Sequence, residues 1–261
     1  RGSVPLAAKK PQSRLYVGGG SAASTGVEVP GSLMLKRWRY QKRCRAIAEQ
    51  CEREVAVSYV SGCPALKVDT LENTPLIAVD LEMTGLDATQ HEIIAIGWTQ
   101  LDRGRICLES NRHILINSEQ SVGHSAAIHE LMDNELERGV SLETGLEALF
   151  EAARGRVWLF HHAGLDVSFL QRACIPWTGV AMPFVVLDTL QIELALRKRR
   201  NLTVHQGDMQ LRTLRENYNL PGYTAHNALI DACATAELFL AIAAYMDKRG
   251  SLNLKPYLKY Y

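Results

Sequence analysis

Short apolar runs, separated by polar turns and amphipathic stretches, predict an α/β fold for this chain. Five runs are apolar enough, and rich enough in β-branched or aromatic residues, to be strands buried within a sheet. They cover residues 76–79, 92–99, 106–116, 157–160 and 184–187. A turn signal at 102–104 lies between the second and third runs, so we expect the first three strands to form an antiparallel meander.

Helical patterns fill most of the gaps between these strands. We expect helices at 32–53, 126–136 and 142–150, after Asp166, after Asp188, from Asp208 onward and over 227–246. Ser141 is the expected N-cap of the third of these helices. Three consecutive strands, then helix–strand–helix–strand, predict a mixed five-stranded sheet flanked by helices, with an N-terminal helical extension.

Changes in composition divide the chain into four expected regions. Gly, Ser and Pro dominate the first residues, where little periodic apolar pattern is present. The expected regions are a flexible N-terminal tail at 1–31, a helical extension and linker at 32–73, the main domain at 74–250 and a C-terminal tail at 251–261.

Bulk composition is that of an ordinary soluble globular protein, with 261 residues, 47% hydrophobic and 22% charged. A net charge of +1 gives no global attraction to nucleic acid, so any such binding must come from local patches. No apolar run approaches the roughly 18 residues of a membrane span, so we expect no membrane segment. Six cysteines without a C-x-x-C pair indicate reduced thiols, and we expect a cytoplasmic protein.

One expected helix concentrates positive charge next to aromatic residues. Trp38 and Tyr40 lie among six basic residues, which are Lys36, Arg37, Arg39, Lys42, Arg43 and Arg45. Such a face can hold a phosphate backbone and stack bases, or it can simply be a solvated helix surface. Both interpretations stay open at this point, and the run at 197–200 raises the same pair of alternatives.

Two carboxylates project together from the first expected strand. Asp80 ends the apolar run and Glu82 follows two residues later, so both side chains point to the same side of the strand. Gly85 then allows a sharp turn. The pair fits a metal site, although a salt-bridged pair at a strand end is the structural alternative.

Three further polar residues lie where helices are expected to begin. Asp166 follows the fourth strand, Asp231 lies about one turn into the last helix, and His226 precedes that helix. In open α/β sheets the ligand crevice lies at the strand ends, where these groups would converge with Asp80 and Glu82. Two carboxylates about 4 Å apart repel by roughly 4 kcal/mol at an effective dielectric of 20, so a cluster of four calls for cations. Oxygen-only ligands favour Mg²⁺ or Mn²⁺.

These motifs together resemble those of a known enzyme family. Asp80-x-Glu82, His162-x-x-x-Asp166 and His226-x-x-x-x-Asp231, in this order, resemble the DEDDh group of DnaQ-like 3′–5′ exonucleases. The similarity extends from about residue 76 to 245. It implies a ribonuclease H-like fold, two Mg²⁺ or Mn²⁺ ions, and release of nucleoside 5′-monophosphates from a 3′ end.

The resemblance also implies roles for individual residues. Asp80, Glu82, Asp166 and Asp231 would be metal ligands and His226 the general base. Substrate contacts are expected from Met83, Thr84, Gly85, Leu86 and His162.

The natural substrate is less sharply indicated. The first motif is closer to oligoribonuclease, whereas the Asp166 motif is more similar to the proofreading epsilon subunit of bacterial DNA polymerase III. We expect single-stranded DNA ends as substrate and a polymerase or repair partner. RNA processing and a catalytically inactive nucleic-acid-binding or scaffold protein are the alternatives.

Overall fold

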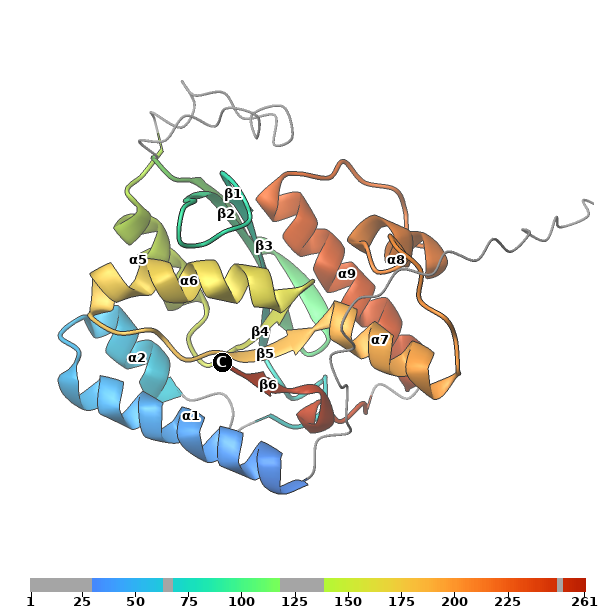
Figure 1. Cartoon of the computed structure of the whole chain (residues 1–261), viewed down its shortest axis with the longest axis horizontal. Coiled ribbons are helices and arrows are strands. Elements are labelled where there is room, and N and C mark those ends of the chain that lie inside the picture. Colours follow the sequence, from blue (N-terminus) through green and yellow to red (C-terminus); the bar gives the residue numbers. More distant parts are fainter. Residues whose placement is uncertain (1–29, 63–67, 118–138, 248–250) are drawn as a thin grey trace, which may run out of the picture.

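A mixed six-stranded sheet forms the centre of the protein (Figure 1). The structure is a computed structural model that describes residues 30–62, 68–117, 139–247 and 251–261. The strand order is β3-β2-β1-β4-β5-β6. The strands are β1 (Leu76–Met83), β2 (Ile93–Asp102), β3 (Arg105–Leu115), β4 (Val157–Phe160), β5 (Val185–Asp188) and β6 (Lys259–Tyr260). The predicted α/β fold and antiparallel β1–β2–β3 meander are confirmed.

Helices cover both faces of this sheet (Figure 1). They are α1 (Pro30–Gln50), α2 (Glu54–Gly62), α5 (Leu142–Ala152), α6 (Ala163–Thr178), α7 (Thr189–Arg199), α8 (Leu211–Asn217) and α9 (Ala228–Met246), with a short 3-10 helix, η3 (Lys255–Tyr257). α9 packs on β1 and β2, whereas α5 packs on the other face of β2, next to Ile96. Ser141 caps α5 by accepting a hydrogen bond from the Thr144 N–H, as predicted.

The sheet has one strand more than predicted. β6 pairs antiparallel with β5 through residues that we expected to lie in a C-terminal tail. Leu254 and Leu258 are buried, so residues 251–261 contribute to the core. Only two residues form the strand, which is too short to be recognised from a hydrophobic pattern.

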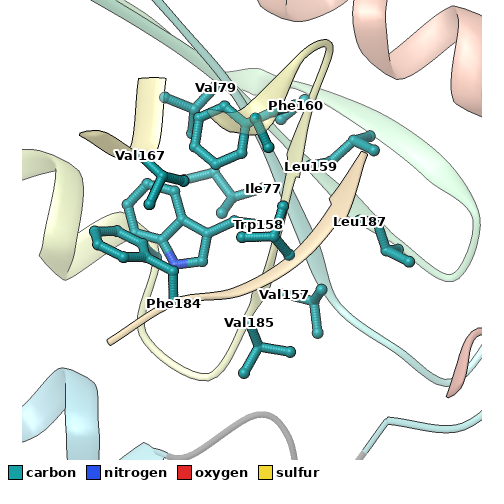
Figure 2. Close-up of a cluster of buried hydrophobic side chains, with 14 of the residues drawn as sticks. Ile77, Val79, Val157, Trp158, Leu159, Phe160, Val167, Phe184, Val185 and Leu187 are labelled. Carbon is teal, nitrogen blue, oxygen red and sulfur yellow. The ribbon is translucent and has the colours of Figure 1, made fainter. Parts of the chain in front are cut away.

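The linker expected within residues 32–73 also differs from the structure. Tyr59 lies in α2 and is fully buried. Its hydroxyl donates to the carbonyl of Pro183 at 2.9 Å and accepts from the indole N–H of Trp158 at 2.9 Å. Trp158 lies against Phe184 in the core between β1, β4 and β5 (Figure 2), so α2 supplies part of the main core.

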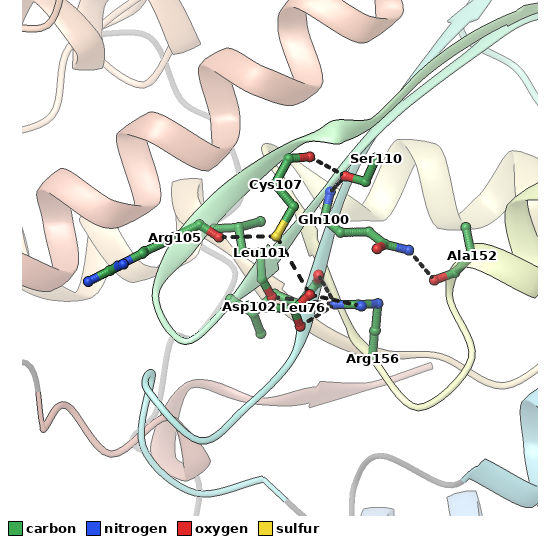
Figure 3. A network of polar contacts seen from close by, with 9 residues as sticks. All are labelled: Leu76, Gln100, Leu101, Asp102, Arg105, Cys107, Ser110, Ala152 and Arg156. Carbon is green, nitrogen blue, oxygen red and sulfur yellow. Dashed lines mark hydrogen bonds and ion pairs between the residues drawn. The ribbon is translucent and has the colours of Figure 1, made fainter.

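A polar network fixes the strands at the edge where β1 begins (Figure 3). Arg156, immediately before β4, forms an ion pair with Asp102 at 2.7 Å and donates to the carbonyl of Leu76 at 3.3 Å. Gln100 donates to the carbonyl of Ala152 at 3.0 Å, which joins β2 to the end of α5. These contacts set the relative positions of β1, β2 and β4.

Helix α9 corrects the expectation that no apolar run reaches the length of a membrane span. By length and composition alone it is the one helix in the described part of the chain that could cross a membrane, with a mean hydropathy of 1.6. A core helix meets the same criterion, and α9 packs against β1 and β2. Its apolar character therefore matches its place on the sheet.

Three other expected elements either lie outside the described residues or begin at a different residue. The tail before residue 30 and the helix at 126–136 lie outside the described residues. The helix expected from Asp208 begins instead at Leu211. Asp208 accepts hydrogen bonds from the His205 N–H and from Arg197, and so stabilises the preceding turn.

Candidate active site

Acidic residues meet at the sheet edge where the parallel strands β1, β4 and β5 end. Asp80 and Glu82 lie near the end of β1 with their side chains on one face. The β1–β2 pairing shifts register immediately after Glu82. This irregularity ends the regular ladder where the substrate-binding loop is predicted to begin.

Gly97 allows the last helix to reach this edge. It pairs with Asp80 in the β1–β2 ladder, so it faces the same side of the sheet. A Cβ atom at this position would lie 2.0 Å from the carbonyl carbon of Ala228, which belongs to the first turn of α9. The backbone of α9 therefore rests directly on β2, and this contact brings Asp231 to Asp80 and Glu82.

Asp231 completes a group of three carboxylates. One oxygen from each of Asp80, Glu82 and Asp231 lies within 4.8 Å of the other two. Asp231 accepts a hydrogen bond from the backbone N–H of His226 at 2.8 Å and another from the hydroxyl of Tyr223. Its carboxylate is therefore held by the segment that precedes α9.

Asp166 lies next to this group and belongs to α6, whereas Asp231 belongs to α9. It lies in the first turn of α6, is 6% exposed, and accepts a hydrogen bond from the backbone N–H of Leu81, between Asp80 and Glu82. The turn before α6 is fixed by Asp188, whose carboxylate accepts from the N–H groups of His162 and Ala163. Asp188 also caps α7, so one buried carboxylate holds two helix starts.

The electrostatics of the site follow from burial and crowding. Burial raises the pKa of Asp80 well above its ordinary value, and the charges of Asp166, Asp231 and Glu82 raise it further. Burial likewise raises the pKa of Asp166 to about 8. The pKa of Asp231 is also raised by burial, against the hydrogen bonds that favour its charged form. A cluster of this kind is stabilised by bound cations.

The donor set is suited to a divalent metal. Three converging carboxylates offer hard oxygen ligands, which Mg²⁺ and Mn²⁺ prefer. Asp166 lies outside the group of three but is the strongest of the neighbouring charges acting on Asp80. The acidic cluster can therefore hold metal. The structure brings Asp80, Glu82 and Asp231 together, and Asp166 lies next to them but outside the group of three.

The residues predicted to contact substrate lie at the end of β1, in the loop that follows it, and at the start of α6. Met83 ends β1, and Thr84 closes the following loop by accepting from the Glu92 N–H at 3.1 Å. Leu86, on that loop, is 79% exposed. His162 and His226 are also exposed, and both have a positive φ, of 72° and 69°. A left-handed conformation is uncommon for a residue other than glycine and recurs at functional sites.

The sequence matches the exonuclease family RNase_T over residues 77–239, which is more than half of the chain. The chain belongs to the exonuclease family. The resemblance drawn from the three motifs is thereby confirmed, and so is the predicted class of enzyme.

Curated relatives of this exonuclease include longer proteins. The chain is 29% identical to a PolC-type DNA polymerase III of Thermotoga petrophila over 71% of this chain and 13% of that protein. It is 27% identical to the 3′–5′ exonuclease DinG of Staphylococcus haemolyticus, over 64% of this chain and 18% of that protein. The chain thus spans less than a fifth of the length of either relative.

Solved nucleases share the fold of this exonuclease. Cell-death related nuclease 4 aligns with a TM-score of 0.57 at 14% identity, over 69% of this chain and 65% of that one. The nuclease domain of 3′hExo, a DEDDh family member bound to rAMP, aligns with a TM-score of 0.51 at 12% identity, over 69% and 95% of the two chains. These likenesses support the expected ribonuclease H-like architecture.

Two residues of this exonuclease site were missed from the sequence. Gly97 has a recognisable signal, because glycine inside an apolar strand often marks a close backbone approach. Tyr223 has none, since a tyrosine in a polar loop gives no indication of its partner.

Proposed function

We propose that this chain is a metal-dependent 3′–5′ exonuclease that hydrolyses single-stranded DNA ends and releases nucleoside 5′-monophosphates. The observation that carries the proposal is the approach of Asp80, Glu82 and Asp231 to within 4.8 Å, on the fold of an exonuclease. The relatives of known structure include Exonuclease X in complex with 5′ overhanging duplex DNA.

Metal ligation is proposed for four carboxylates, those of Asp80, Glu82, Asp166 and Asp231. Two bound Mg²⁺ or Mn²⁺ ions would supply a more acidic attacking water and charge compensation at the leaving oxygen. Asp166, hydrogen-bonded to Leu81, keeps its carboxylate beside those on β1. Asp231 is kept in place by the N–H of His226.

His226 is the proposed general base. The imidazole of a histidine can take the proton of the attacking water and release it to solvent. Its exposed position next to Asp231 is compatible with this role. The segment from Met83 to Leu86 would lie near the terminal nucleotide, with exposed Leu86 against its base.

A direct test is the loss of activity in Asp80→Ala and Asp166→Ala. We expect both variants to remain folded by circular dichroism and to lose at least about 1000-fold in the rate of degradation of a labelled single strand, since electrostatic groups at such sites contribute on the order of several kcal/mol. Arg105→Ala, on the exposed part of β3, is the control variant. Wild-type rates in either aspartate variant would refute the site.

RNA is the second candidate substrate, because the segment from Asp80 to Asp87 is closer to oligoribonuclease. One solved neighbour is a 3′-exonuclease that recognises the histone mRNA stem-loop. Rates on matched ribo- and deoxyribo-oligonucleotides separate the two, and a marked preference for diribonucleotides would identify the RNA-processing alternative. Binding without Mn²⁺-dependent turnover would instead identify an inactive binding protein. A polymerase or repair partner and a cytoplasmic location stay predictions.

A further inference from the structure

We infer that Tyr223, packed against the buried guanidinium of Arg215, is a positioning residue for the metal-binding carboxylate of Asp231. This inference rests on the proposed function and adds a residue to it. The segment between α8 and α9 carries both Tyr223 and His226, so its conformation determines where both side chains lie.

Arg215 is the anchor of this segment. It lies in α8 and is 3% exposed, which is uncommon for an arginine. It donates to the carbonyl of Pro221 at 3.0 Å, in the segment itself, and to the carbonyl of Ala234 at 2.9 Å, in α9. An ion pair with Glu237 at 2.7 Å compensates its charge. The guanidinium therefore joins the segment to the helix that carries Asp231.

Tyr223 connects this anchor to the acidic cluster. The guanidinium carbon of Arg215 lies 5.0 Å from the centre of the Tyr223 ring, within the range of a cation–π contact. The hydroxyl of Tyr223 donates to the carboxylate of Asp231. One end of the side chain is thus fixed by a buried cation and the other holds a carboxylate of the site.

Asp231 consequently has two donors from the same segment. The His226 N–H and the Tyr223 hydroxyl restrict the carboxylate to an orientation that faces Asp80 and Glu82. Groups that orient metal ligands in this way contribute substantially to metal affinity, and their loss typically costs tenfold or more. Losing the Tyr223 hydroxyl should therefore weaken metal binding without removing any ligand.

The test compares Tyr223→Phe with Tyr218→Phe in the full chain. Phe at 223 keeps the ring over Arg215 and removes only the hydroxyl. Tyr218 is a matched control, because its hydroxyl also donates to a carboxylate, that of Glu193, at 2.8 Å, but outside the site. Two readouts are measured: the Mn²⁺ concentration that gives half of the Mn²⁺-induced rise in melting temperature, and kcat and KM on a labelled single strand.

We expect Tyr223→Phe to require about tenfold more Mn²⁺ in the melting assay. We also expect a lower kcat at fixed Mn²⁺ with KM for the strand unchanged, and wild-type behaviour from Tyr218→Phe. Arg215→Lys, which lacks the planar fork, should raise the Mn²⁺ requirement in the same direction.

Two results would overturn the inference, and they differ. A wild-type Mn²⁺ requirement in Tyr223→Phe refutes the role of Tyr223 and leaves the proposed function intact. No Mn²⁺-dependent change in the melting temperature of the wild-type protein refutes the metal site, and the role of Tyr223 with it.

Discussion

Asp166 has a charge that the fold tolerates poorly in the absence of cations. Its folded pKa is raised to about 8 by burial, above the ordinary value of 3.8. The stability associated with a raised carboxyl pKa is fully present below the unfolded pKa and is lost as the pH rises through the folded one. The cation-free protein should therefore lose stability between about pH 4 and pH 8.

Replacing this charge should stabilise the cation-free protein. We predict that Asp166→Asn raises the free energy of unfolding at pH 8 in EDTA by several kcal/mol, because the pKa of Asp166 is raised from 3.8 to about 8 and each pH unit corresponds to about 1.4 kcal/mol. The gain should shrink at pH 5, and Mn²⁺ should stabilise the wild-type protein more than the variant. Urea unfolding at both pH values measures this. A variant less stable than wild type at pH 8 would contradict the prediction.

At the residue scale, the sequence predicts the acidic residues of the site better than it predicts the residues that hold them in position. Asp80 and Glu82 follow from the two-residue repeat of a strand, and Asp166 and Asp231 from their positions at helix starts. The support given by Tyr223 depends on its contact with Arg215 across the end of α8, which no hydrophobic pattern encodes. Asp188 was expected only at the start of one helix, whereas its simultaneous hydrogen bonding at the starts of α6 and α7 requires the folded chain.

At the scale of elements, the docking of α9 on β2 depends on a missing side chain. We predict that Gly97→Ala lowers the free energy of unfolding by about 3 kcal/mol, within the range of overpacked cores, because the added methyl would overlap backbone of α9. Activity should fall with it, since Asp231 moves with the helix.

Gly164→Ala is the control for this variant. A Cβ at that position meets nothing within 4 Å, and the residue lies in α6. Its melting temperature should stay within a few degrees of wild type or rise slightly, because alanine favours helix. Equal stability of Gly97→Ala and wild type would show that α9 can move without cost.

The exposed face of α1 is the second feature at this scale. Trp38 is 55% exposed, and the ammonium of Lys42 lies 5.6 Å from the centre of its ring. The opposite face packs through Tyr40, Cys44 and Ile47, so the helix presents its basic side outward.

Charge reversal on this face tests whether it holds substrate. We predict that Arg39→Glu combined with Lys42→Glu raises KM several-fold at low salt and changes kcat little, because phosphate contacts contribute to affinity and are screened by salt. Arg105→Glu, exposed on β3, controls for overall charge. An unchanged KM at low salt would leave α1 with a solvated face and no role in binding.

At the scale of the whole molecule, the N-terminal helices and the exonuclease domain share one core. Tyr59 is enclosed by Phe150 and Trp158, with ring centroids 4.9 and 6.2 Å away. The sequence predicted a linker here and not a buried helix, because a single tyrosine does not reveal which residues it contacts in the fold. The same limit applies to β6, because its two residues can be recognised as a strand only from their pairing with β5.

Tyr59→Phe should therefore destabilise the entire protein. The variant loses its bond to Pro183 and leaves the indole N–H of Trp158 without its acceptor, which should lower the free energy of unfolding by about 1–3 kcal/mol. Unfolding should remain a single transition by fluorescence and circular dichroism. Tyr245→Phe, 56% exposed, is the control. Separate transitions for the helices and the domain would contradict a shared core.

The distribution of the acidic cluster along the chain has a consequence for newly made protein. Asp80 belongs to β1 and Asp231 belongs to α9. The two carboxylates come together only after α9 has packed against β2. A growing or proteolytically cut polypeptide that lacks either part holds an incomplete set of carboxylates. Under the proposed function, such fragments are expected to lack nuclease activity, and turnover would report that the molecule has finished folding.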